Sequence, residues 1–150
     1  MVKLNKKQNI LRLVLLSITT LGIYYVIWFC STQNQIHKQM NQGLSGVLHI
    51  LLSAFTGGIY AVVWHFLVGL YIKRAGGKNR GLLYGLPFTV TFIVTLMFCI
   101  TFIRNAIGIP TEPWLSYLIG GLLMFATMLI SMAFIQSDIN KISLQSEIEE

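Results

Sequence analysis

The sequence contains four long stretches without a single Lys, Arg, Asp or Glu, and this feature constrains the fold most strongly. These stretches are residues 13–36, 39–72, 81–103 and 113–137. Charged residues make up 11% of the 150-residue chain and apolar residues 55%, whereas about a quarter of a soluble domain is charged. So little charge cannot cover the surface of a soluble globule. The composition therefore predicts a membrane protein.

A fourteen-residue motif occurs twice, 36 positions apart, within the first two of these stretches. Residues 15–28 read LLSITTLGIYYVIW and residues 51–64 read LLSAFTGGIYAVVW, with nine of the fourteen positions identical. The shared pattern, L-L-S-x-x-T-x-G-I-Y-x-V-x-W, is an internal repeat. Each copy lies in an apolar run long enough to cross a bilayer, so we interpret it as a membrane element and not as a solenoid unit.

The apolar runs predict an all-α membrane protein with four transmembrane helices in a single integral-membrane domain, residues 1–150. The predicted spans are about 10–30, 47–72, 82–103 and 114–135, followed by a tail at 136–150. Thr20 and Gly22 interrupt the first span, and Thr56 and Gly58 interrupt the second. The interruption is either a kink in a continuous helix, which we favour, or a turn between two shorter helices.

The distribution of basic residues predicts the orientation of these spans. With four spans, nine Lys and Arg residues lie on one side of the membrane, and two, Lys38 and Arg104, lie on the other. The side with more Lys and Arg is normally cytoplasmic, so we expect both termini and the loop at 73–81 in the cytoplasm. Consecutive spans run in opposite directions, and the two motif copies are therefore expected to form an inverted repeat.

Each motif copy also carries an aromatic pair on one helix face. Tyr24 and Trp28 are one turn apart, as are Tyr60 and Trp64. We interpret the pairs as an aromatic belt at the membrane interface, with glycine-mediated packing of the two spans. An aromatic-lined ligand groove is the alternative.

His65 and the basic loop are the remaining candidates for a site. His65 lies within a predicted span and is either an intramembrane functional group or an ordinary hydrogen-bonded histidine. The loop side chains are expected to set the topology and to contact anionic lipid headgroups. They are Lys73, Arg74, Lys78 and Arg80.

No pattern in the sequence indicates catalysis or metal binding. Cys30 and Cys99 show no Cys-x-x-Cys or Cys/His ligand spacing. Nucleotide-binding, hydrolase and zinc-protease motifs are absent from the sequence. We therefore expect no catalytic residue, no metal and no cofactor.

The doubled motif, together with the segment IQSDINK at residues 135–141, resembles the family called domain of unknown function 4234. The resemblance extends over about residues 10–142. Members of this family look like small multi-span proteins of the bacterial inner membrane without an established activity. The resemblance therefore implies a bacterial cytoplasmic membrane and supplies no catalytic residue.

These observations favour a non-enzymatic interaction or accessory module. Its expected partners are the lipid bilayer and either another membrane protein or a second copy in a homodimer. A nucleic-acid partner is not expected, because the basic residues flank apolar runs and do not line one face of a soluble helix. A small oligomeric transporter or channel is the main alternative, and a membrane enzyme that uses His65 is the third hypothesis.

Overall fold

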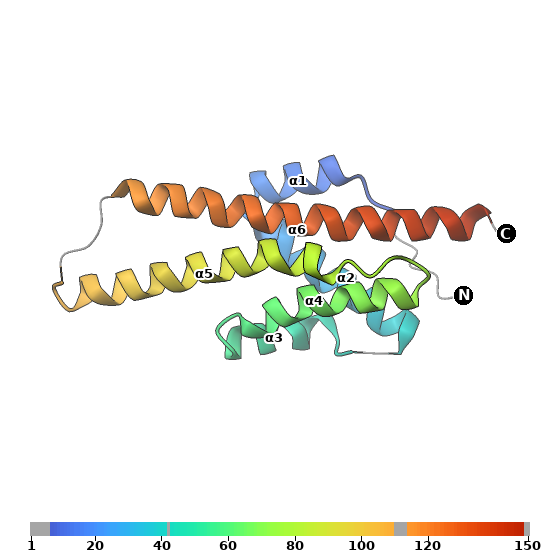
Figure 1. The fold of residues 1–150 in the computed structure, drawn as a ribbon, viewed down its shortest axis with the longest axis horizontal. Helices are drawn as coiled ribbons and strands as arrows, with labels where there is room; N and C mark the ends of the chain where they lie inside the picture. The colour runs from blue at the N-terminus through green and yellow to red at the C-terminus, as the bar shows by residue number, and fades with distance from the viewer. Residues whose placement is uncertain (1–6, 42, 110–113, 149–150) are drawn as a thin grey trace.

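The computed structural model describes residues 7–41, 43–109 and 114–148, which form six helices and no strand (Figure 1). The predicted all-α class is therefore confirmed. The helices are α1 (Ile10–Thr19), α2 (Ile23–Met40), α3 (Gly46–Phe55), α4 (Ile59–Arg74), α5 (Gly81–Ala106) and α6 (Trp114–Ile148).

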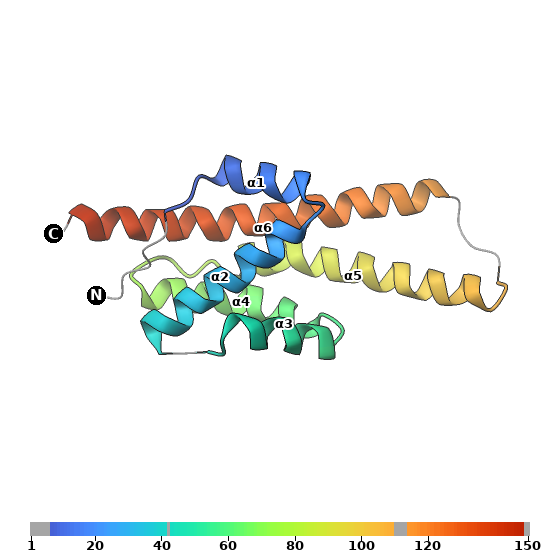
Figure 2. The ribbon, with the colours of Figure 1, turned by 180° about the vertical axis from the view of Figure 1, so that it is seen from behind.

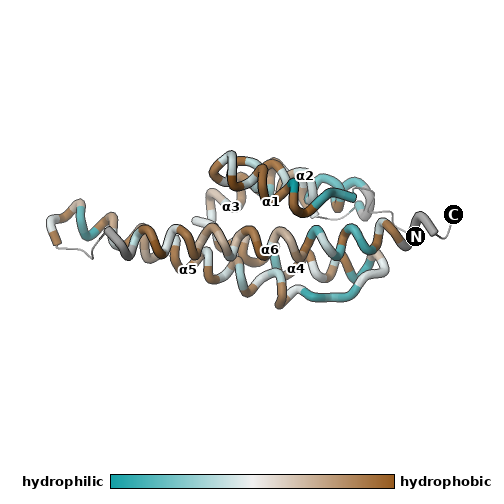
Figure 3. Tube along the Cα trace, turned by 90° about the horizontal axis from the view of Figure 1, so that it is seen from above, coloured by the Kyte–Doolittle hydropathy of each residue, from teal (hydrophilic) through white to brown (hydrophobic). Residues whose placement is uncertain are grey.

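The two longest helices, α5 and α6, form an antiparallel hairpin that runs the length of the molecule (Figures 1 and 2). Helices α1 to α4 gather around the half of this hairpin that lies nearest the two chain ends, and they leave its far half uncovered. Viewed from above, the hairpin is mostly apolar, and hydrophilic residues collect near the chain ends and at the far tip (Figure 3).

Both long helices are long and apolar enough to cross a membrane. They contain the spans predicted at 82–103 and 114–135, and α6 continues as a helix to Ile148 through most of the predicted tail. In the most apolar eighteen-residue window of each helix, 11% of the residues of α5 and 17% of those of α6 are buried. A core helix of a soluble protein would be mostly buried, so these two helices lack that character.

The first motif copy forms a turn between two helices and not a kink. Helix α1 ends with hydrogen bonds from the Gly22 N–H to the Ser17 carbonyl (2.8 Å) and from the Leu21 N–H to the Ile18 carbonyl (3.1 Å). This is the pattern of a Schellman motif, which needs a left-handed residue after the helix. Leu21 and Gly22 have φ angles of 49° and 91°. The chain therefore reverses, and α2 starts afresh at Ile23.

The threonine of the motif joins the two helices across the turn. The Thr20 hydroxyl donates a hydrogen bond to the Leu16 carbonyl (2.7 Å) and accepts one from the Tyr24 N–H (3.0 Å). One side chain thus supplies an acceptor for the Tyr24 N–H, which lacks one at the start of α2, and adds a second donor to the Leu16 carbonyl, which already accepts the Thr20 N–H (3.0 Å). This explains why the motif contains a threonine two residues before its glycine.

The second motif copy forms the same turn between α3 and α4. The Thr56 hydroxyl donates to the Leu52 carbonyl (2.8 Å) and accepts from the Tyr60 N–H (3.0 Å). The Gly58 N–H bonds to the Ser53 carbonyl (2.7 Å), and Gly58 has a φ angle of 93°. The identical residues of the two copies therefore perform the same local task.

The prediction of single helices at 10–30 and 47–72 is wrong, because each is two shorter helices separated by this turn. The inverted repeat is also not supported. Each motif copy forms a complete helix-turn-helix unit, and both turns point the same way, towards the far end of the α5–α6 hairpin (Figures 1 and 2). The left-handed backbone at Gly22 and Gly58 is the physical reason, since it ends the helical hydrogen-bond ladder.

Substitution of Gly58 tests the turn geometry. Gly58→Ala is expected to reduce the free energy of unfolding by about 1–3 kcal/mol, because it places a side chain at positive φ. The added Cβ would also lie 3.2 Å from the Phe92 ring. Gly121→Ala is the control, since a Cβ there meets no atom within 4 Å, and it should be neutral or stabilising by up to about 1 kcal/mol. Denaturant titration in mixed micelles measures the free energy of unfolding of both variants. Equal changes in Gly58→Ala and Gly121→Ala would contradict the left-handed turn at Gly58.

Removal of the Thr20 hydroxyl tests the bridge between the helices. Thr20→Val is expected to cost about 1–3 kcal/mol, because it leaves the Tyr24 N–H without an acceptor in apolar surroundings. Thr20→Ser keeps the hydroxyl and should remain close to wild type. Thr19→Val removes an exposed hydroxyl with a single weak bond to Leu16 (3.2 Å), so its effect should stay within about 0.5 kcal/mol. The same titration would contradict the bridge if both valine variants were equally stable.

Candidate functional site

The two motif tryptophans lie in the protein core and make equivalent hydrogen bonds. The Trp28 indole N–H donates to Oε1 of Gln136 on α6 (2.9 Å), and the Trp64 indole N–H donates to Oε1 of Gln33 on α2 (2.7 Å). Trp28 is 3% exposed and Trp64 is 1% exposed. A buried indole needs an acceptor for its single donor, and a glutamine supplies it in each case. The predicted aromatic belt is therefore wrong for these residues, which bind the helices together.

The motif tyrosines occupy less buried positions beside them. Tyr24 is partly buried and packs against the core cluster. The hydroxyl of Tyr60 lies 3.3 Å from Nε2 of His49, which is on α3. The aromatic residues of the motif thus lie at the interfaces between helices and contribute to helix packing.

His65 is completely buried, and its two ring nitrogens both have partners. Nδ1 lies 2.7 Å from the Ala61 carbonyl, and Nε2 lies 2.7 Å from the Tyr25 hydroxyl. A carbonyl oxygen only accepts, so Nδ1 carries the proton and Nε2 accepts from Tyr25 in a neutral imidazole. The ring also stacks on Phe88 at a centroid distance of 3.8 Å. This geometry matches the interpretation of His65 as a hydrogen-bonded structural histidine.

His49, on α3, lies near an aromatic ring that also packs beside His65, that of Phe29. The Phe29 ring lies 6.2 Å from the ring of His49 and 6.1 Å from that of His65, measured between centroids. His49 is 2% exposed, and its Nδ1 has no hydrogen-bond partner among the residues that the structure describes. Both histidine rings thus lie near the Phe29 ring, at an edge-on angle for His49 and a stacked one for His65.

A second group of polar residues lies where the loop before α5 meets α6. Asp138 on α6 is its centre: Oδ2 accepts a hydrogen bond from the Tyr84 hydroxyl (2.5 Å), and Oδ1 accepts one from Lys141 Nζ (2.9 Å). Nη1 of Arg80 lies 3.6 Å from the same Oδ1. The Asp138 side chain is 9% exposed, whereas those of Arg80 and Lys141 are 42% and 60% exposed. A buried carboxylate therefore holds two cations that face outwards.

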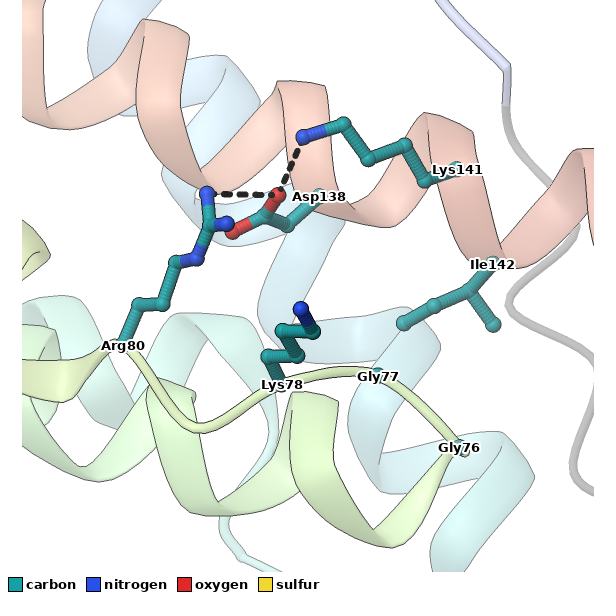
Figure 4. A pocket seen from close by; sticks show the side chains of 7 residues that line it. All are labelled: Gly76, Gly77, Lys78, Arg80, Asp138, Lys141 and Ile142. Atoms are coloured by element: carbon teal, nitrogen blue, oxygen red, sulfur yellow. Dashed lines mark hydrogen bonds and ion pairs between the residues drawn. The ribbon is translucent and has the colours of Figure 1, made fainter.

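These side chains border a cavity of about 240 Å³ between the loop and α6 (Figure 4). We call this space the basic cavity. It is lined by Gly76, Gly77, Lys78, Arg80, Asp138, Lys141 and Ile142.

The shape of the loop brings its backbone close to α6. Gly76 has a φ angle of 95°, and the Gly77 N–H closes α4 by bonding to the Ile72 carbonyl (2.9 Å). A Cβ on Gly77 would lie 2.8 Å from the Cδ1 atom of Ile142. Glycine at 77 is therefore needed for this close approach, which forms one wall of the basic cavity.

The structure divides the basic residues predicted to contact lipid into two pairs. Lys78 and Arg80 line the basic cavity, whereas Lys73 and Arg74 are exposed on the last turn of α4 and do not line it. The sequence analysis missed Tyr84, Asp138 and Lys141. The spacing of Asp138 and Lys141, three residues apart on one helix, was the available signal.

Comparison with known proteins finds a family similarity in the N-terminal part of the chain. Residues 8–74 match the family described as Domain of unknown function (DUF4234). This matched segment, slightly less than half of the chain, is similar to that family. No curated protein and no solved structure matches the chain.

The DUF4234 match contains α1 to α4 and both motif copies, whereas α5 and α6 lie beyond it. The predicted resemblance is therefore confirmed, but it does not continue to residue 142 as we expected. The buried pairs Trp64–Gln33 and Tyr25–His65 lie entirely within the DUF4234 segment. The basic cavity combines the last loop residues after this segment with α6.

Substitution of Tyr25 tests the buried pair in the DUF4234 segment. Tyr25→Phe is expected to destabilise the protein by about 1–3 kcal/mol, because it leaves Nε2 of His65 buried without a partner. Tyr24→Phe is the matched control, since Tyr24 is only partly buried, and its effect should be within about 0.5 kcal/mol.

A double-mutant cycle separates the hydrogen bond from general packing. If the bond contributes, Tyr25→Phe and His65→Phe together should cost less than the sum of the two single losses. Unfolding titrations of the four proteins measure this coupling. Strict additivity would contradict a direct Tyr25–His65 interaction.

Proposed function

We propose that the protein is a non-enzymatic integral-membrane module that crosses the bilayer with α5 and α6 only. In this proposal the α1–α2 and α3–α4 hairpins enter the lipid from the side of the chain ends and turn back at mid-depth. The observation that carries the proposal is the position of the two motif turns beside the middle of the long helices.

The contacts of the two turns support this depth. Gly22 lies near Phe125 and Met128 of α6, and Gly58 lies near Phe92 of α5, close to the middle of that helix. Helices α1 and α3 each have ten residues, which corresponds to about 15 Å of helix. This is half of the roughly 30 Å hydrocarbon core of a bilayer. The shorter arm of each hairpin therefore has the length to reach the midplane and not the far side.

The side chains at the tips of the hairpins are large, apolar and exposed. Leu21 at the first turn is 90% exposed, and Phe55 at the second is 87% exposed. If such a side chain stays in water, the protein loses the stabilisation of about 1.5–3 kcal/mol that its burial would give. Lipid chains around the two turns would remove this cost, which supports insertion.

The backbone of the turns is also suited to lipid, where an unpaired polar group is costly. Every N–H from Thr20 to Tyr24 in the first turn, and from Thr56 to Tyr60 in the second, has an acceptor within the turn. The acceptors in the first turn are the carbonyl oxygens of Leu16, Ser17, Ile18 and Thr20 and the Thr20 hydroxyl. A break in a helix can therefore lie in hydrocarbon without exposing these donors.

The charge distribution agrees with this topology better than with four spans. Of the nine Lys and Arg residues that the structure describes, eight lie on the side of the chain ends, and Arg104 lies at the far tip. Four spans would separate these nine residues seven to two. An excess of Lys and Arg marks the cytoplasmic side, so we place both termini in the cytoplasm of a bacterial cell.

Two features favour an interaction or accessory role. The buried polar side chains at Trp28, Trp64, Tyr25 and His65 are used in bonds within the fold. The far half of the α5–α6 hairpin is left uncovered by the other helices (Figures 1 and 2), which leaves an apolar surface for lipid, another membrane protein or a second copy. This arrangement suits a module that positions itself in the bilayer and binds there.

Cysteine labelling from each side of the membrane tests the proposed topology. Single cysteines at Leu44, Lys78 and Ile109, in a chain with Cys30→Ser and Cys99→Ser, are treated with an impermeant maleimide. We expect Leu44 and Lys78 to react from the cytoplasmic side and Ile109 from the opposite side. Labelling of Leu44 together with Ile109, as four spans require, would refute the proposal, and permeabilised membranes control for reactivity at all three positions.

A further inference from the structure

We propose that the basic cavity binds the phosphate group of an anionic phospholipid at the cytoplasmic surface of the bilayer. This inference rests on the membrane insertion proposed above and adds a specific ligand site to it.

The charges around the basic cavity favour an anion. The lining contains three cations, Lys78, Arg80 and Lys141, and one carboxylate, Asp138, so it carries an excess of positive charge. Both oxygens of Asp138 already have partners, Tyr84 and Lys141 by hydrogen bonds and Arg80 by an ion pair. Arg80 has five N–H donors and a lysine has three. Donors therefore remain for a second anion, while Asp138 holds Arg80 and Lys141 in place.

The three cations come from two elements and line one space. Lys78 and Arg80 extend from the loop, and Lys141 lies on α6, three residues after Asp138, with its ammonium group turned towards that carboxylate (Figure 4). Guanidinium and ammonium groups suit phosphate oxygens, the first through paired N–H donors and the second as a point charge. The volume of about 240 Å³ gives room for a phosphate with its glycerol ester. Ile142 supplies an apolar wall for the remainder of a lipid.

The position along α5 matches the headgroup layer. The charge-free stretch 81–103 begins at Gly81, directly after Arg80, so the hydrocarbon boundary falls beside the basic cavity. The N-terminal end of a long helix also carries partial positive charge, which favours an anion there. A lipid phosphate lies at this depth by default, whereas a soluble phosphate must be captured from water. The two sources share the same chemistry, and the experiment separates them.

Native mass spectrometry of the full-length protein measures lipid retention with phosphatidylglycerol and with phosphatidylcholine. We expect selective retention of phosphatidylglycerol and a loss of about fivefold in its affinity for Lys78→Gln, the effect of one lysine near an anionic surface. Arg80→Gln should act in the same direction. Lys73→Gln is the matched control. It removes the same charge at a position five residues before Lys78 that does not line the basic cavity, so this variant should retain the lipid.

Three outcomes would overturn the inference. Equal losses in Lys73→Gln and Lys78→Gln would indicate general attraction to the membrane surface and no site. Unchanged retention in Lys78→Gln and Arg80→Gln would exclude the basic cavity. Displacement of phosphatidylglycerol by an equal concentration of inorganic phosphate would assign the site to a soluble phosphate.

Flotation with lipid vesicles distinguishes failure of this inference from failure of the proposed function. If the wild-type protein remains with the vesicles after alkaline extraction but shows no preference for phosphatidylglycerol, only the proposed lipid site is contradicted. A wild-type protein released from the vesicles contradicts membrane insertion itself. The Lys78→Gln variant should float as the wild type does, because Lys78 is exposed on the loop.

Discussion

Each of the two motif turns interrupts a helix in apolar surroundings, and one threonine hydroxyl in each turn reconnects the two helix ends. Thr20 and Thr56 accept the N–H that begins the second helix and donate to a carbonyl that ends the first. Without this bridge, the N–H of Tyr24 in the first turn and that of Tyr60 in the second would lack an acceptor. The positions of α1 to α4, and the buried contacts that they make with α5 and α6, depend on the chain reversing at these points.

The buried polar pairs then determine how the helices pack. Trp28 bonds to Gln136 and connects α2 to α6, while Trp64 bonds to Gln33 and connects α4 to α2. A buried hydrogen bond is directional, and an unmade one is costly, so these pairs favour one packing arrangement over others with similar apolar contact. The same repeated tryptophan thereby serves two different interfaces.

Asp138 links the fold to the proposed site. Its contact with Tyr84 holds the start of α5 against α6, and its contacts with Arg80 and Lys141 gather positive charge at the same end of the hairpin. Both the structural and the electrostatic roles follow from one carboxylate at the boundary of an apolar hairpin. In the proposed topology this boundary coincides with the cytoplasmic headgroups.

Several features follow from the sequence by itself: the all-α class, the two long apolar helices, and the repeat of the motif at 15–28 and 51–64, on which the family similarity was predicted. These depend on local composition and spacing, which a single chain displays directly. The choice between a kink and a turn required the structure, because Thr20 and Gly22 are compatible with both until the φ angles and the Thr20 hydrogen bonds are known. The burial of Trp28 and Trp64, and the meeting of Arg80 with Asp138, also emerged only from the tertiary structure. Gln136 lies 108 positions after Trp28, and Asp138 lies 58 positions after Arg80. Contacts over such separations depend on how the helices pack and not on the local sequence pattern.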